Sequence, residues 1–154
     1  MIGAVEGAAV GGGATILLHF DAVFIAPNAK IKYPFSDLGL APEVGSSFLL
    51  FQSLGYQQAA QLLFESQPID GNRYHELGLA KYVGEDCLVE ANKYAHMLKE
   101  QSLSSIIETK AILTSFMQED IAKSRSMETA AMKKLFGSED NIKAVEKFFA
   151  KKNS

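Results

Sequence analysis

Three consecutive glycines, Gly11, Gly12 and Gly13, are the first residues whose type and spacing could support a reaction. They follow a short apolar run and precede a predicted helix, so their amides belong to the unpaired donors of a helix N-terminus. Such donors can stabilise a developing oxyanion, and the missing side chains leave room for a carbonyl oxygen to approach the backbone. The alternative is that the glycines only permit close packing of the helix against a strand.

Glu43 is the second candidate, a carboxylate in a loop just before a predicted apolar helix. It follows Pro42 and lies two residues before Gly45. A carboxylate held in such a loop could remove a proton from carbon as a general base. The alternatives are a solvated surface glutamate or one that satisfies the amides of the following helix. Asp37 is a neighbouring rival for the same role.

The sequence does not indicate a bound nucleotide or a metal ion. The glycines do not form a Gly-x-Gly-x-x-Gly fingerprint with a later acidic residue, and the Walker lysine is absent. Cys87 has no second cysteine for an internal disulfide, and His19, His75 and His96 are too far apart for zinc-ligand spacing. We therefore expect no metal and no separate cofactor.

Composition and charge are those of one globular domain. Of the 154 residues, 47% are apolar and 21% are charged, and the formal net charge is −3. Without a basic excess, neither nucleic acid nor an anionic membrane is an expected partner. The apolar residues 1–18 carry Glu6 and no basic start, so they are read as neither a signal peptide nor a membrane span. A cytoplasmic location is expected by default, and a peroxisomal or mitochondrial one stays open if the N-terminus is truncated.

The apolar runs predict strands first and helices later. Predicted strands cover residues 2–5, 22–26 and 30–33. Residues 34–45 are a predicted loop, and Ser46 and Ser47 are predicted to cap the helix that follows it. Predicted helices cover residues 46–54, 56–65, a short piece between the cap Asp70 and the stop Gly78, and then 86–101, 103–117, 119–135 and 139–151.

Two segments give the chain a resemblance to a known family. They are GAVEGAAVGGGATILLHFDAVFIAP and, after a short gap, YPFSDLGLAPEVGSSFLLFQSLG. In order and spacing they resemble the second oxyanion-hole segment and the active-site loop of the crotonase (enoyl-CoA hydratase/isomerase) superfamily. The stretch from Pro34 to Glu43 is similar to the Δ3,Δ2-enoyl-CoA isomerase branch. A later stretch, IDGNRYHELGLAKYV, and the helical tail are also similar to the family, so the resemblance spans nearly the whole chain.

The resemblance implies an α/β fold with a crotonase-like (ClpP/crotonase) spiral core. Residues 1–85 are expected to form the C-terminal part of that core, and residues 86–154 a helical oligomerisation region. Because family members form trimers or hexamers, a homo-trimer or hexamer is expected. The family's upstream segment has no counterpart in these residues, so the chain resembles the C-terminal part of a family member.

The resemblance also implies which residues form the site. The amide of Gly12 corresponds to one of two backbone donors that stabilise a thioester enolate, and the second donor comes from the upstream segment. Glu43 corresponds to the carboxylate that moves the proton in isomerases. The other candidate contacts to an acyl-CoA substrate are Gly11, Gly13, Phe35 and Pro42. For Phe35 the alternative is a plain core position.

Isomerisation is the reaction that these residues favour. The two glutamates of the family's hydratases correspond to Thr15 and Phe35, and neither can hold and deprotonate a water. Moving a double bond needs one base, so the expected reaction converts 3-enoyl-CoA to trans-2-enoyl-CoA in fatty-acid β-oxidation, with coenzyme A as part of the substrate. The alternatives are a catalytically inactive acyl-CoA-binding or interaction module and an enoyl-CoA hydratase.

Overall fold

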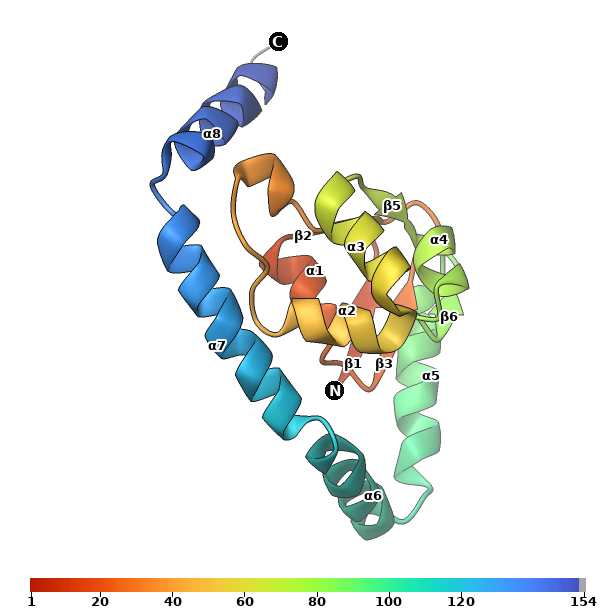
Figure 1. The fold of residues 1–154 in the computed structure, drawn as a ribbon. Helices are drawn as coiled ribbons and strands as arrows, with labels where there is room; N and C mark the ends of the chain where they lie inside the picture. The colour runs from red at the N-terminus through yellow and green to blue at the C-terminus, as the bar shows by residue number, and fades with distance from the viewer. Residues whose placement is uncertain (153–154) are drawn as a thin grey trace.

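The computed structural model describes the backbone of residues 1–152 and the side chains of residues 1–150. The strands are β1 (Ile2–Val5), β2 (Ala8–Val10), β3 (Ala22–Ile25), β4 (Lys30–Lys32), β5 (Ile69–Asp70) and β6 (Tyr82–Val83). The helices are α1 (Gly12–Leu17), the 3-10 helix η1 (Ser36–Leu38), α2 (Ser46–Leu54), α3 (Tyr56–Glu65), α4 (Gly71–Glu76), α5 (Cys87–Lys99), α6 (Leu103–Ser115), α7 (Gln118–Leu135) and α8 (Glu139–Lys152). The strands and α1–α4 form one body, and α5–α8 run along its outside (Figure 1).

Two small sheets, each of three strands, form the centre of the fold. In the first sheet β1, β3 and β6 are parallel, and in the second β4 pairs in parallel with β2 and antiparallel with β5. The chain passes from the first sheet to the second twice, from β1 to β2 across residues 6–7 and later from β3 to β4. The two passages are stacked, with Gly3 opposite Val23 and Ala9 opposite Ile31. This stacked repeat agrees with the predicted spiral core.

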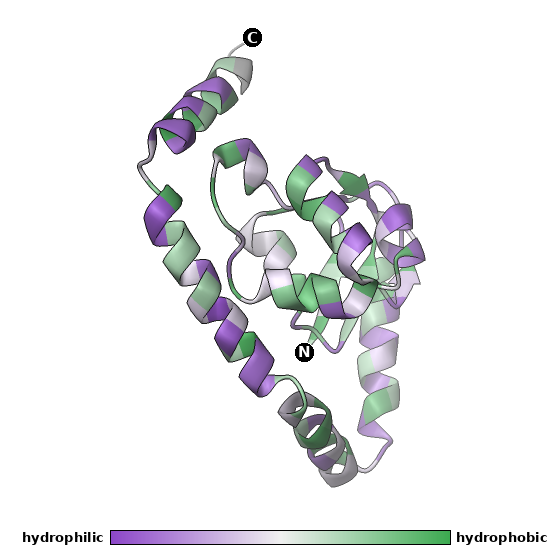
Figure 2. Cartoon of the chain, viewed as in Figure 1, coloured by the Kyte–Doolittle hydropathy of each residue, from purple (hydrophilic) through white to green (hydrophobic). Residues whose placement is uncertain are grey.

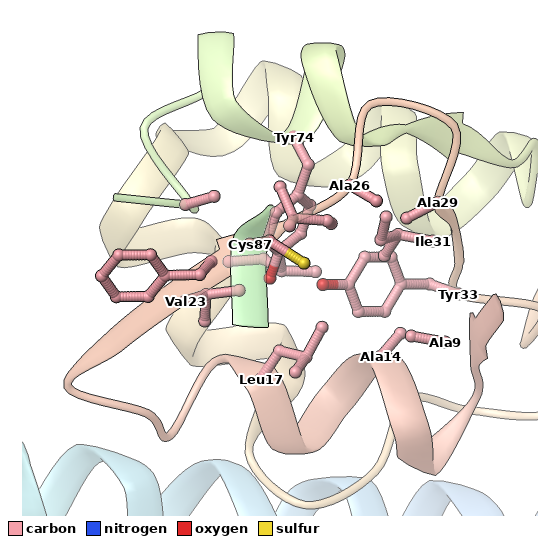
Figure 3. Close-up of a cluster of buried hydrophobic side chains, with 14 of the residues drawn as sticks. Ala9, Ala14, Leu17, Val23, Ala26, Ala29, Ile31, Tyr33, Tyr74 and Cys87 are labelled. Atoms are coloured by element: carbon pink, nitrogen blue, oxygen red, sulfur yellow. The ribbon is translucent and has the colours of Figure 1, made fainter. Parts of the chain in front are cut away.

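The hydrophobic core lies among the strands and the helices α1 to α5, and Figure 3 shows part of it. Strand β3 is buried at every position, and Ile25 and Ile31 are fully buried. Small side chains keep neighbouring segments close, and these are Ala9, Ala14, Ala26 and Ala29. The start of α4 comes closest, because a Cβ atom on Gly71 would lie 2.0 Å from the carbonyl oxygen of Ala26. Packing in this region therefore requires a residue without a side chain.

Two tyrosines, Tyr33 and Tyr74, place their rings in this core (Figure 3). Burial raises the pKa of Tyr74 to about 12. Burial and the neighbouring phenol of Tyr74 raise the pKa of Tyr33 well above its usual value. Tyrosines of the unfolded chain ionise near pH ~10. The stability that the neutral phenols contribute is therefore present below about pH 10 and is lost as the pH rises toward about 12.

We expect the free energy of unfolding of the wild-type protein to fall between about pH 9 and about pH 11 more steeply than that of Tyr74→Phe. Phenylalanine keeps the ring in the core and removes the group that loses its proton in the unfolded chain. Chemical denaturation across this pH range measures both slopes. Parallel pH dependences would contradict the assignment of the alkaline loss to Tyr74.

The helix boundaries agree with the prediction for α2 and α3, but the predicted cap of α2 is wrong. Asp70 caps α4 as predicted, by accepting a hydrogen bond of 2.8 Å from the amide of Arg73. Ser46, in contrast, is already the first helical residue of α2, and neither it nor Ser47 caps the helix. The N-cap residue is Gly45, which has no side chain. The amides at this helix start need an acceptor from elsewhere in the fold.

Four helices follow the last strand and contact the rest of the fold at separate points. Helix α5 packs against β1 and β3, α7 against α2, and α8 against η1. Asn141 of α8 donates to the carbonyl of Leu38 at 2.6 Å and accepts from the amide of Gly137 at 2.9 Å. Lys110 of α6 donates to Asp21 at 2.6 Å. The helices α6, α7 and α8 therefore each contact an earlier part of the fold.

Large apolar side chains remain exposed from α6 to the end of α7. They are Leu103, Ile107, Ile112, Leu113, Phe116, Met127 and Phe136. The hydropathy colouring shows apolar residues interspersed with polar ones along α7 (Figure 2). Exposed apolar area of this kind is typical of surfaces that contact another protein. None of the helices in the described part of the chain is long and apolar enough to cross a membrane.

Candidate active site

The glycine segment opens helix α1 with two unpaired amides. Gly11 has a φ of +58°, and its amide donates to the carbonyl of Lys32 at 3.0 Å, at the end of β4. The carbonyl of Gly11 accepts the first hydrogen bonds of α1. The next two amides, those of Gly12 and Gly13, have no acceptor among the described residues, and both glycines are exposed. Their N–H groups are therefore free to donate to a bound molecule.

The loop that carries Glu43 ends in a strained turn. Val44 has a φ of +58° and Gly45 a φ of +81°. A β-branched residue rarely adopts this left-handed conformation, which costs on the order of 1–3 kcal/mol. His19, just after α1, supports the turn, because its Nε2 lies 2.8 Å from the carbonyl of Val44. Neighbouring groups, and not the preference of Val44 itself, hold the loop in this geometry.

The structure brings Glu43 and Gly12 together. A Cβ atom on Gly12 would lie 3.5 Å from Oε1 of Glu43. The Glu43 side chain is partly exposed, and its carboxylate has no hydrogen-bond or ion-pair partner among the described residues. A free carboxylate beside free amide donors can transfer a proton next to an oxygen on which negative charge develops.

Comparison with known proteins shows the family to which this chain belongs. The family model described as enoyl-CoA hydratase/isomerase matches residues 1–154. The chain belongs to the enoyl-CoA hydratase/isomerase family. Crotonyl-CoA hydratase of Syntrophomonas wolfei is 30% identical over 156 residues, which cover 100% of this chain and 60% of that protein. Short-chain-enoyl-CoA hydratase of Clostridium acetobutylicum is 29% identical over 154 residues, which cover 99% of this chain and 59% of that protein.

Solved structures with related sequences share the fold. An enoyl-CoA hydratase/isomerase from Pseudoalteromonas atlantica matches with a TM-score of 0.90 and 29% identity, over 96% of this chain and 60% of the other. OdaA of Pseudomonas aeruginosa matches with a TM-score of 0.90 and 35% identity, over 96% of this chain and 61% of the other. The α/β crotonase-like fold with a helical C-terminal region is thereby confirmed. The chain spans about 60% of the length of the curated relatives named above.

Thr15 and Phe35, the residues expected at the positions of the hydratase glutamates, are both buried. Thr15 is fully buried, and its hydroxyl donates to the carbonyl of Gly11 at 3.0 Å. Phe35 is 5% exposed and belongs to the core cluster. Neither side chain offers an exposed polar group to a water molecule. The contact between Phe35 and a substrate stays a prediction.

The other predicted substrate contacts, Pro42, Gly11 and Gly13, have different surroundings. Pro42 and Glu43 line a pocket of about 320 Å³ that α7 borders on its other side. A side chain on Gly11 would lie 3.9 Å from Pro34, whereas Gly13 faces open space. The pocket at Pro42 is therefore a space next to the candidate base.

Asp37, the rival carboxylate, is engaged elsewhere. It accepts a hydrogen bond of 2.5 Å from the ammonium group of Lys32. Both residues line a second pocket, of about 620 Å³, between η1 and α8. This second pocket includes neither Glu43 nor the glycines. The structure therefore favours Glu43 as the carboxylate next to the free amides.

A buried glutamate that sequence reasoning missed, Glu128 of α7, completes the support of the loop. It is 6% exposed, and its carboxylate accepts from the amide of Gly45 at 2.7 Å and from the amide of Ser47 at 3.0 Å. The hydroxyls of Ser47 and Ser124 also donate to it, at 2.6 Å and 3.2 Å. Glu128 is the acceptor that the start of α2 needs. A serine and a glutamate four positions apart on a polar helix were the available signal, and such pairs are ordinary on exposed helices.

Proposed function

We propose that this family member is an isomerase that shifts the double bond of a 3-enoyl-CoA to the trans-2 position, in fatty-acid β-oxidation. The observation that carries the proposal is the unengaged carboxylate of Glu43 beside Gly12, whose amide has no acceptor among the described residues. Thr15 and Phe35, expected at the positions of the hydratase glutamates, also support the proposal. Neither is a carboxylate, and both are buried. One base and one oxyanion donor remain, and these are what a double-bond shift uses.

A single carboxylate can carry out both proton transfers. Glu43 takes the proton from C2, and the electrons of the broken C–H bond delocalise over the thioester carbonyl and the C3–C4 double bond. The dienolate carries negative charge on the carbonyl oxygen, to which the amide of Gly12 donates. The protonated Glu43 then delivers the proton to C4, a double bond forms between C2 and C3, and the carboxylate is regenerated. The second oxyanion donor is expected from the family's upstream segment.

Hydration is the competing proposal, because the relatives from Syntrophomonas and Clostridium are named hydratases. Adding water requires a group that orients and deprotonates the water and an acid that protonates carbon. The hydroxyl of Thr15 already donates within α1, and Phe35 has no polar group. Glu43 alone cannot serve as both the group that deprotonates the water and the acid that protonates carbon. This disfavours hydration.

Two assays on the intact purified protein test the proposal. With a 3-enoyl-CoA, we expect formation of the conjugated thioester, which is followed by its absorbance. With trans-2-enoyl-CoA, we expect no loss of that absorbance through hydration. Hydration without isomerisation would overturn the proposal. Binding of an acyl-CoA without turnover in either assay would favour a catalytically inactive binding or interaction module.

The proposal includes an acyl-CoA substrate and no further cofactor, because a carboxylate and backbone amides supply every group that the reaction uses. We also propose that the protein forms a homo-trimer or hexamer. Phe116 and Phe136 are 76% and 75% exposed, and a second copy of the chain could cover this apolar area. The cytoplasm stays the expected location.

A further inference from the structure

We propose that Glu128 is a positioning residue for the general base, because its hydrogen bonds fix the loop in which Glu43 faces Gly12. The inference rests on the proposed function, in which Glu43 moves the proton. Glu128 contacts the loop and has no part in the proton transfer itself. Its effect on the reaction is therefore expected to pass through the orientation of Glu43.

Glu128 takes the place of an N-cap side chain at the start of α2. The first amides of a helix have no partner within the helix, and Gly45 brings no side chain that could accept from them. Glu128 supplies a buried carboxylate to the amides of Gly45 and Ser47, at 2.7 Å and 3.0 Å. Hydrogen bonds to an ionised acceptor are stronger than neutral ones, and negative charge is favourable at a helix N-terminus. The start of α2 is thereby fixed to α7.

This attachment reaches Glu43 through one residue. Only Val44 separates Glu43 from Gly45, and Val44 holds the strained φ of +58°. Such a conformation persists only where the surroundings impose it. His19 binds the carbonyl of Val44 at 2.8 Å from the side of α1, and Glu128 binds the amide of Gly45 from the side of α7. Releasing the second attachment lets the turn relax and moves the Glu43 carboxylate away from the glycines.

The test is Glu128→Gln in the intact protein. The substitution keeps the size of the side chain and replaces one acceptor oxygen by an NH₂ group that faces N–H and O–H donors. We expect kcat for isomerisation to fall about ten- to a hundredfold, as for a small displacement of a catalytic group. We expect KM to change less than about threefold, because Glu128 makes no substrate contact in the proposal. The amides of Gly45 and Ser47 are expected to lose protection from hydrogen exchange.

Glu119→Gln is the matched control. Glu119 is an exposed glutamate of the same helix, so its substitution makes the same chemical change away from the loop. We expect wild-type kcat, KM and amide protection. If Glu128→Gln does not fold, Ser124→Ala takes its place, because it removes one hydroxyl donor and leaves the carboxylate. A fall in kcat of severalfold with reduced protection at Gly45 is then expected.

The outcomes separate this inference from the proposed function. Wild-type kcat in Glu128→Gln would overturn the positioning role and leave the isomerase proposal standing. A uniform loss of amide protection with unchanged kcat of the folded fraction would also overturn it, since that is the effect of a merely structural residue. A wild-type protein without isomerase activity would contradict the proposed function. Hydrogen exchange at Gly45 and Ser47 would then still decide whether Glu128 fixes the loop.

Discussion

Replacing Glu43 by glutamine is expected to lower isomerase turnover by about a thousandfold, which corresponds to about 4 kcal/mol of transition-state stabilisation. An amide of the same size cannot take the proton from C2 or return it to C4. The fold is expected to stay intact, because the Glu43 carboxylate has no hydrogen-bond partner among the described residues. Steady-state kinetics with a 3-enoyl-CoA measures the loss, and the melting temperature checks the fold.

Asp37→Asn provides the matched comparison for the Glu43 substitution. It removes the other carboxylate of the same loop region, which is bound to Lys32 in a different pocket. Turnover within about twofold of the wild-type value is expected. If Glu43→Gln kept full turnover, Glu43 would lose its assignment. If Asp37→Asn abolished turnover, the base would have to be sought at Asp37.

Gly71→Ala is expected to lower the free energy of unfolding by about 3 kcal/mol or more. The new Cβ atom would lie 2.0 Å from the carbonyl oxygen of Ala26 and 3.3 Å from Cγ1 of Ile25. The amide of Gly71 also donates to the carbonyl of Pro27 at 3.1 Å, so the helix start cannot move away without losing that bond. Urea denaturation of the wild-type and substituted proteins measures the difference.

Gly7→Ala is the control for added volume at a glycine. A Cβ atom at Gly7 would have no described atom within 4 Å, and the carbonyl of Gly7 would still accept from the amide of Lys30. A change within about 0.5 kcal/mol is expected. Equal stabilities of the two alanine variants would show that the close approach of Gly71 to Ala26 does not limit the packing.

Local patterns were sufficient for the helices and the longer strands of this fold. Glycines at 45, 55 and 78 mark helix ends that the structure places at or next to the predicted residues. The strands β5 and β6 were not predicted, because each is two residues long and is defined by its partner strand. Ala8–Val10 is not among the predicted strands either, and its parallel pairing with β4 makes it one. The residue types of such short segments do not predict which distant strand they pair with.

Some residues of the candidate site could be predicted from the nearby sequence, and others depend on partners that are distant in the sequence. Gly12 and Glu43 could be proposed from their own motifs and from a family resemblance. The partners that hold their loop could not, because His19 and Glu128 act on backbone groups far away in the sequence. Ser46 was expected to cap α2 by the ordinary local rule. The true acceptor arrives from α7, and tertiary contacts override the local preference.

The attachment of α7 to the base loop also bears on the order of folding. The hydrogen bonds from Glu128 to Gly45 and Ser47 span 83 and 81 residues. Contacts of such long range form late, because the intervening chain must be ordered before they can stabilise it. On a ribosome, the loop with Glu43 emerges well before α7 and must wait for it. We then expect the docking of α7, which orients Glu43 through Glu128, to be among the last steps of folding.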